Sequence, residues 1–573
     1  MRAGCLIAVL ICAAQALAWV ALPASAEDQA TPVLQSSPAS APPAPSTVPA
    51  SEPPPTAEAA PAEAKPDPVV QIIRAMLADP SLGKGANADD LAAVQAFYAS
   101  RTGRPLWTTE MGFSAKGQAA LFGIENADDW GLDASAFELP PVGALPAKPE
   151  DQAIAEIKLD LAVLKYARFA RGGRFNPPEL SVLLDQTPHV RDPRTVLAEI
   201  AAADAPDRYL QSLHPKHEQF GRLRQALLKA RGKENAEQAE VKPAEANASD
   251  DAKKLGEAAK KAGEGADAKP AASDKDIKRI IMNMERWRWM PEDLGPVHVW
   301  NNSPEFMLYV VKDGKKIYAD KTLVGTIGYA TPVFTADMTN IIFNPDWIAP
   351  ETVVTENLLP ALRDGNYSIL KIHKLSVSYN GTPVDPTRVD WGRVNILSYA
   401  FSQRAGPENV LGKVKFWFPN KHTVYMHDTL PVRKKYFKQP VRMIGHECVR
   451  MEKPLEFANV LLAAGKGWST SQVKEQWDNG VNSSVIFDHK IPVHMTYFTA
   501  VVDDAGKLST FADIYGLDNK MAKAMFGSAA GFPVPPPEPK KPQGEEASTS
   551  RPASRTASGG NDIAGSLSGF VGD

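Results

Sequence analysis

One cysteine and two histidines near the C-terminal end of the chain have types and spacing that suit nucleophilic catalysis. Cys448 lies in the sequence Gly445-His446-Glu447-Cys448-Val449-Arg450, and His427 lies upstream in Tyr425-Met426-His427-Asp428-Thr429. A free thiol is only a few per cent ionised at neutral pH, so it needs a base nearby. The imidazole of His427 or His446 can take the thiol proton. The alternative interpretation is a core thiol beside a histidine that ends a strand.

The cysteine count bears on the same question. The sequence has three cysteines, and Cys5 and Cys12 lie in an apolar N-terminal leader. Residues 1–26 have the pattern of a secretory signal, with Ala24-Ser25-Ala26 as a small-residue cleavage site. If it is not cleaved, this leader would act as a membrane anchor. In an exported chain Cys448 would be the single thiol, and hence buried filler, an intermolecular link or a nucleophile. We therefore predict a protein of the periplasm or cell envelope.

Net charge and the spacing of histidines restrict the kinds of partner and ligand that we expect. The net charge is −4 and the isoelectric point is near 6.3, which gives no basic footprint for nucleic acid. His189, His214 and His217 have no companion carboxylates at metal-ligand spacing. We therefore expect no nucleic-acid partner, no bound metal and no cofactor.

Composition separates two folded regions from three low-complexity segments. Residues 27–71, 234–273 and 529–573 have few large apolar side chains, so we predict disordered tethers there. Residues 72–233 are expected to form a helical scaffold domain, because apolar residues recur at helical spacing. These are Leu91, Val94, Phe97 and Tyr98; Ile154, Ile157, Leu161 and Leu164; and Leu210, Leu213, Phe220, Leu223, Leu227 and Leu228.

Residues 274–528 change character and complete an α+β fold class. Ser273 or Asp274 is a plausible N-cap for a helix that runs to Trp287, and 455–462 is a second helical segment. Short strand-like runs make up most of the rest. They lie at 297–300, 306–311, 317–324, 414–418, 423–426, 493–502 and 508–514. Many short strands with few helices predict a mostly antiparallel, sandwich-like β domain.

The residues in this second region match a known pattern. Residues 276–515 resemble L,D-transpeptidases with a YkuD-type catalytic domain, in particular the long YcbB-like subgroup. That family carries a histidine followed, after a gap, by Ser/Thr-His-Gly-Cys, and in the subgroup by Val/Ile-Arg. The resemblance rests on the cysteine and histidine segments above and on four further stretches. These are Asn283-Met284-Glu285-Arg286, Thr331-Pro332-Val333-Phe334, Gly412-Lys413-Val414-Lys415-Phe416 and Phe418-Pro419-Asn420.

The resemblance implies a cysteine-dependent acyltransferase of peptidoglycan biosynthesis, and so a role in cell-wall biogenesis and cell shape. Cys448 would attack the L-centre carbonyl of diaminopimelate in a donor tetrapeptide stem and release D-alanine. The amine of an acceptor stem would then convert the thioester into a 3→3 cross-link. His427 matches the general base and His446 the histidine that shapes the site. Arg450 and Tyr425 are the expected substrate-binding residues.

Several alternatives stay open at this point. Water in place of the amine would give an L,D-carboxypeptidase, and loss of activity would leave a non-catalytic wall-binding scaffold. Carbapenems would acylate Cys448 only if it is a nucleophile. The alternative interpretation of Arg450 is that it forms a structural ion pair with Glu452 or Asp428. By resemblance, a lid over the site is expected within 350–412.

Two positions depart from the family motif. Gly445 stands in place of Ser/Thr, and Glu447 stands in place of the glycine before the cysteine. Glycine allows backbone conformations that other residues avoid, and a carboxylate beside a thiolate opposes ionisation. If the segment is a strand, Glu447 faces away from Cys448 while His446 flanks it. Glu447 would then pair with Arg442 or Arg450.

Overall fold

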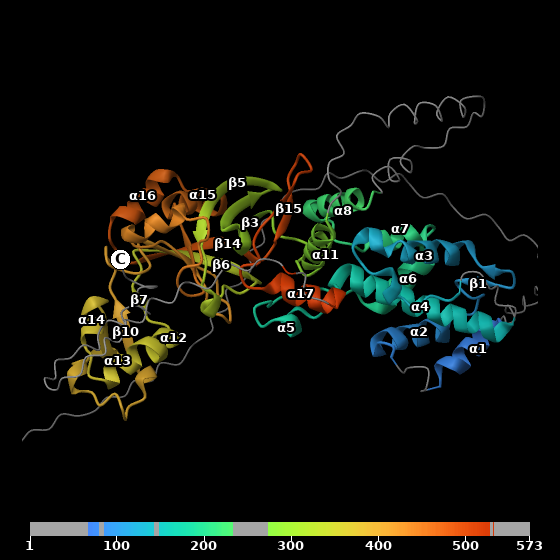
Figure 1. Ribbon diagram of the computed structural model, residues 1–573, viewed down its shortest axis with the longest axis horizontal. Helices are drawn as coiled ribbons and strands as arrows, with labels where there is room; N and C mark the ends of the chain where they lie inside the picture. Colours follow the sequence, from blue (N-terminus) through green and yellow to red (C-terminus); the bar gives the residue numbers. More distant parts are fainter. Residues whose placement is uncertain (1–66, 80–84, 142–147, 233–272, 528–530, 532–573) are drawn as a thin grey trace, which may run out of the picture. The chain divides into compact units, whose positions relative to one another are not determined.

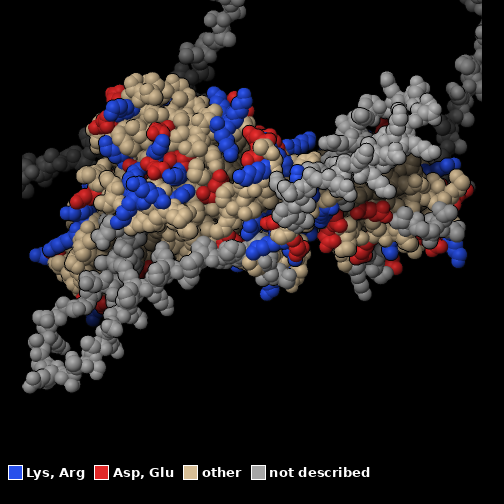
Figure 2. Space-filling view, turned by 45° about the horizontal axis from the view of Figure 1, so that its top comes forward, with Lys and Arg blue, Asp and Glu red and all other residues tan. Residues whose placement is uncertain are grey.

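The computed structural model describes residues 67–79, 85–141, 148–232, 273–527 and 531, all within one compact unit, 64–573. The expected leader lies outside these residues. So do the three expected tethers, except at their edges. Of the helices described, none is both long and apolar enough to cross a membrane. On the face drawn in Figure 2, basic and acidic side chains are interspersed.

The first folded region is helical, as predicted. Several of its helices begin at a proline, whose missing N–H costs nothing in the first turn. The long central helix ends at Gly172 and is followed by Gly173, which adopts a φ of 82°. The helices are α1 (Pro68–Leu77), α2 (Ala88–Ser100), α3 (Ala115–Glu125), α4 (Pro149–Gly172), α5 (Pro177–Leu180), α6 (Pro193–Ala202), α7 (Pro206–Ser212) and α8 (Glu218–Ala230).

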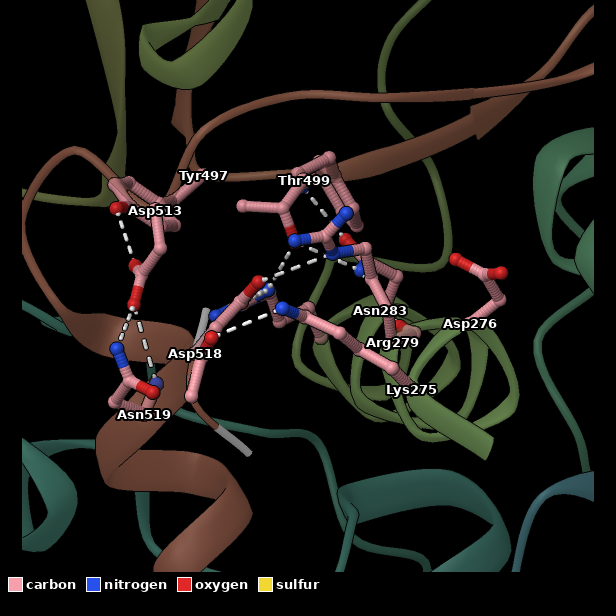
Figure 3. Close-up of polar contacts among 12 residues, drawn as sticks. Lys275, Asp276, Arg279, Asn283, Tyr497, Thr499, Asp513, Asp518 and Asn519 are labelled. Atoms are coloured by element: carbon pink, nitrogen blue, oxygen red, sulfur yellow. Dashed lines mark hydrogen bonds and ion pairs between the residues drawn. The ribbon is translucent and has the colours of Figure 1, made fainter. Parts of the chain in front are cut away.

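Helix α11 (Asp274–Arg288) opens the second region, and Ser273 is its N-cap, as expected. The Ser273 hydroxyl accepts a hydrogen bond from the Asp276 N–H at 3.2 Å. The helix is tied to the C-terminal elements by a buried polar network (Figure 3). In it, Asn283 donates to the Thr499 hydroxyl at 3.0 Å, and Arg286 pairs with Asp518 of α17 (Leu517–Phe526) at 2.7 Å. The Asn283-Met284-Glu285-Arg286 stretch is therefore structural.

The strands of the second region close into a barrel of eight, in the order β11-β12-β13-β5-β4-β3-β14-β6. The strand-rich expectation is confirmed, but one closed barrel replaces the two stacked sheets of a sandwich. Two of its strand pairs, β12 with β13 and β14 with β3, are parallel. The bounds are β3 (Val297–Asn302), β4 (Met307–Lys312), β5 (Lys315–Leu323), β6 (Phe334–Phe343), β11 (Val414–Trp417), β12 (Met426–His427), β13 (Val449–Met451) and β14 (Ser483–Thr496).

The segment 347–411 forms a small subdomain with a hydrophobic core of its own, which includes Trp347, Leu358 and Phe401. Its sheet has the order β7-β10-β8-β9. The elements, which gather together in Figure 1, are β7 (Trp347–Ile348), α12 (Glu351–Val353), the π-helix η6 (Val354–Leu358), α13 (Leu359–Arg363), α14 (Ser368–Ile372), β8 (Ser376–Tyr379), β9 (Thr382–Pro383) and β10 (Tyr399–Gln403).

A segment of the scaffold region attaches to the barrel beside β6. The Val333 N–H donates to the Leu183 carbonyl at 2.7 Å, and the Asp185 N–H donates to the Val333 carbonyl at 2.8 Å. The Asp185 carboxylate also contacts the His422 ring at 2.7 Å. Leu184 is 1% exposed and packs within the barrel's hydrophobic core. The first folded region thus supplies part of the packing of the second.

Candidate active site

A cleft of about 1050 Å³ runs between the barrel, the small subdomain and the scaffold segment. The bend 445–448 and the ends of β11, β12 and β13 form its base. Its charged and polar lining includes Glu351, Glu356, Lys415, His422, Tyr425, His427, His446, Glu447, Cys448 and Arg450. All five residues that the sequence nominated for the site, at positions 425, 427, 446, 448 and 450, therefore line one cleft.

Strand register explains why these side chains meet. In the parallel pair of β12 and β13, Met426 lies opposite Val449 and His427 opposite Arg450. Because side chains alternate across a sheet, Met426 and Val449 pack in the barrel core. Their neighbours in the sequence line the cleft instead: Tyr425 and His427 on either side of Met426, and Cys448 and Arg450 on either side of Val449. Lys415 of β11 lies opposite His427 and joins the same face.

Residues 445–448 form a bend, so the predicted strand alternation does not apply to them. Glu447 lines the same cleft as Cys448 and does not face away from it. Among the described residues, Glu447 makes no ion pair with Arg442 or Arg450. Arg442 donates to the carbonyls of Thr322 and Phe306 at 3.1 and 2.8 Å. The proposed pairing of Glu447 is therefore wrong.

The bend needs its glycine at 445 and not at 447. Gly445 has a φ of 90°, and a Cβ built there would lie 2.5 Å from a guanidinium nitrogen of Arg450. Glu447 is not among the residues with positive φ. The two departures from the family motif are therefore compatible with the backbone. The position with a positive φ, 445, is a glycine, and position 447 has no positive φ that would require one.

Cys448 is a partly exposed residue, and its thiol is held in its protonated form. Burial, and to a smaller extent the Glu447 carboxylate, raises its pKa to about 11. A backbone hydrogen bond from Tyr425 and the charges of Arg450 and Lys415 act in the opposite direction. At neutral pH the thiolate is therefore a minor species that forms only when a base removes the proton.

His427 is the buried base candidate. Its side chain is 3% exposed, and burial followed by the charge of Arg450 holds its pKa well below the usual value. The ring is therefore neutral at pH 7 and can accept a proton. Within the described residues Nδ1 has no hydrogen-bond partner, and no hydrogen bond joins the Cys448 sulfur to either imidazole. The resting pair is thus a neutral thiol and a neutral ring.

His446 forms part of the cleft wall. Its ring stacks on Tyr329 with centroids 3.9 Å apart, and the Tyr329 hydroxyl donates to Glu356 of η6 at 2.5 Å. Burial, and then the charge of Arg450, lowers the pKa of His446 to about 4. This ring is also neutral at pH 7. Its packing suits a residue that shapes the site.

Arg450 is 2% exposed, and burial lowers its pKa. Its guanidinium donates to the Ile444 carbonyl at 2.8 Å and has no carboxylate partner among the described residues. Asp428 pairs with Lys434 and Glu452 with Lys321, at 3.2 and 3.9 Å. Neither forms the structural ion pair that was the alternative for Arg450. A buried cation that faces a cleft is suited to bind a carboxylate.

Comparison with known proteins agrees with this geometry. Residues 296–478 match the model of the YkuD family, described as the L,D-transpeptidase catalytic domain. Residues 92–227 match the model described as the scaffold domain. The chain carries a YkuD L,D-transpeptidase catalytic domain and a scaffold domain. The resemblance noted in the sequence is thereby confirmed, while the YcbB-like subgroup stays a prediction.

Individual proteins are also similar to this chain. A Haemophilus influenzae protein named "Putative L,D-transpeptidase" is 31% identical over 256 residues, which cover 44% of this chain and 50% of that protein. The chain therefore spans about half the length of that relative. A solved structure described as the Ldtfm-avibactam carbamoyl enzyme is 12% identical over 35% of this chain and 50% of that chain, with a TM-score of 0.16. A similarity this low adds nothing to the assignment.

The YkuD domain also brings in residues that the sequence did not nominate. The Lys415 ammonium lies over Tyr425 and Trp417, 4.0 and 4.3 Å from the ring centroids. Alternation with the buried Val414 and Phe416 could have placed Lys415 on the cleft face. Glu356 and His422 carried no such signal, because the subdomain and a loop bring them to the site.

Proposed function

We propose that this chain is a peptidoglycan L,D-transpeptidase that forms 3→3 cross-links through a thioester on Cys448. One observation carries the proposal. The thiol of a partly exposed cysteine, a buried neutral imidazole and a buried guanidinium that has no carboxylate partner among the described residues line one cleft of a YkuD domain. The site is proposed to act in the cell envelope, on donor and acceptor stem peptides.

The donor half-reaction begins with the Cys448 thiol. His427 takes the thiol proton as sulfur attacks the L-centre carbonyl of diaminopimelate in a tetrapeptide stem. A carbon–sulfur bond forms, the bond to D-alanine breaks, and the proton passes from His427 to the leaving amine. Because the thiol pKa is about 11, we expect proton transfer to accompany attack.

The surrounding groups support that step in different ways. Arg450 binds a stem carboxylate, and Tyr425, under the Lys415 ammonium, forms part of the substrate wall. Within the described residues the backbone N–H groups of Glu447 and Cys448 donate to no protein oxygen. They are therefore available to an oxyanion. The 347–411 subdomain is proposed as the lid that keeps water from the thioester.

A non-catalytic wall-binding scaffold is the competing function. The raised thiol pKa and the missing sulfur–imidazole hydrogen bond favour it. Carbapenem labelling separates the two, because acylation requires a reactive Cys448. A mass increase that is lost in Cys448→Ala would support the enzyme, and an unlabelled parent chain would support the scaffold.

The deciding experiment is mass spectrometry of muropeptides after incubation with the purified chain. We expect 3→3 dimers and free D-alanine from the parent chain, and neither from Cys448→Ala. Tripeptides without dimers would identify an L,D-carboxypeptidase. Unchanged tetrapeptides in both reactions would overturn the proposal.

A further inference from the structure

The cleft divides its charges between two walls. The sheet face contributes the cations Lys415 and Arg450. The bend and the small subdomain contribute the carboxylates Glu447, Glu356 and Glu351. Cys448 is close enough to both sets of charges for Arg450, Lys415 and Glu447 to act on its charge. A substrate bound across the thiol therefore meets positive charge on one side and negative charge on the other.

Glu447 directly precedes Cys448 in the sequence, and its backbone is fixed by a hydrogen bond. The Thr331 hydroxyl donates to the Glu447 carbonyl at 2.8 Å and accepts from the Gly325 N–H at 3.0 Å. The side chain is half-buried, and no ion pair occupies it within the described residues. Burial and then Glu356 raise the pKa of Glu447, against the influence of His422. Such a carboxylate is poised to exchange a proton.

The acceptor amine has two protons to lose, and His427 can transfer only one of them to sulfur. An α-amine is mostly an ammonium at neutral pH, so two protons must leave its nitrogen as it becomes an amide. One of these two protons is transferred to sulfur, which becomes a thiol again when the carbon–sulfur bond breaks. His427 can carry that one, since its Nδ1 has no partner among the described residues and its side chain is 3% exposed in the same cleft. Once His427 is committed to that proton, the first proton needs another acceptor, and Lys415 and Arg450 are cations that cannot serve.

We propose that Glu447 is a catalytic residue for the acceptor step, binding an acceptor ammonium beside the thioester and taking its first proton. This inference rests on the proposed function and specifies its acceptor. The free amine then attacks the thioester carbonyl, a carbon–nitrogen bond forms and the carbon–sulfur bond breaks. His427 moves the second proton from nitrogen to sulfur. Glu447 releases the first proton, which it took from the ammonium, to solvent. Glu356 adds negative charge to the same ammonium site.

The test measures the two half-reactions separately in Glu447→Gln. Acylation is followed by the mass increase with a carbapenem, and the fate of the thioester by the ratio of dimer to tripeptide from disaccharide-tetrapeptide. We expect acylation as fast as in the parent chain or faster, because a negative charge next to sulfur is lost. The dimer-to-tripeptide ratio should fall about tenfold or more.

Glu452→Gln is the matched control, because Glu452 lies outside the cleft and pairs with Lys321. The inference is overturned if both variants give the same dimer-to-tripeptide ratio. It is also overturned if Glu447→Gln slows acylation and cross-linking by the same factor, which would indicate a structural role. A parent chain that is never acylated would overturn the proposed function itself, and with it this acceptor site.

Discussion

His427 and Arg450 lie opposite one another in the parallel strands β12 and β13, so a neutral imidazole and a buried guanidinium share one wall of the cleft. After burial, the Arg450 charge is the largest influence that keeps His427 unprotonated. The same charge favours the Cys448 thiolate. One cation therefore acts on both the proposed base and the proposed nucleophile, in addition to any carboxylate it binds.

Arg450→Met should consequently change both affinity and pH dependence. We expect kcat/KM for the donor stem to fall about 10- to 100-fold, since a charge-assisted hydrogen bond contributes ~1.5–3 kcal/mol. The pKa of His427 should rise, which moves the acid limb of the acylation profile to higher pH. Arg388→Met is the control, because Arg388 is exposed and pairs with Asp385. An acid limb that stays in place would contradict this coupling.

The thiol should react slowly with a simple alkylating agent in the folded chain. With a pKa of about 11 in place of 9.0, the thiolate fraction at pH 7 is about a hundredfold smaller than in the unfolded chain. Iodoacetamide alkylation, followed by mass spectrometry with and without denaturant, measures the difference. The rate in the folded chain should keep rising with pH through 9 and 10. Equal folded and unfolded rates at pH 7 would show that Cys448 is not desolvated.

Gly445→Ala should destabilise the chain and disturb the donor site together. The substitution places a side chain at a φ of 90° and within 2.5 Å of the Arg450 guanidinium. We expect a cost of about 1–3 kcal/mol and a lower Tm, with a rise in the donor KM. Gly328→Ala is the matched control, because a Cβ at Gly328 would meet nothing within 4 Å. A Tm equal to that of the control would contradict the strain argument.

The scaffold domain contains a buried acid pair that should make stability depend on pH. Asp160 is 0% exposed, and burial followed by the charge of Glu156 raises its pKa well above the usual value. Because the pKa of Asp160 is raised in the folded state, its contribution to the free energy of unfolding is greatest at low pH. That contribution is lost as the pH rises through the pKa of the folded state. Asp160→Asn, which retains an acceptor for the Trp107 indole, should therefore lose less stability between pH 5 and pH 8. Thermal unfolding at both pH values checks this, with exposed Asp151→Asn as control.

Local sequence signals predicted the main helices and the principal site residues, but not the closure of the barrel or the geometry around Cys448. Helical spacing predicted α2, α4 and α11, and the Ser273 cap was expected from its position before the helix. Barrel closure could not be foreseen, because it depends on which distant strands pair, such as β14 with β3. Cys448 and His427 were identifiable from their chemistry. The orientation of Glu447 was not, because a bend replaces the alternation of a strand.

Leu184 belongs to the scaffold region by sequence but to the barrel core by packing, and its neighbours Val182 and Leu183 line the catalytic cleft. A cut placed between the two regions would remove Leu184 from the barrel core and Val182 and Leu183 from the wall of the cleft that contains Cys448. The smallest piece of this chain that retains a complete catalytic groove therefore includes the segment 181–186, long before the barrel's own first strand.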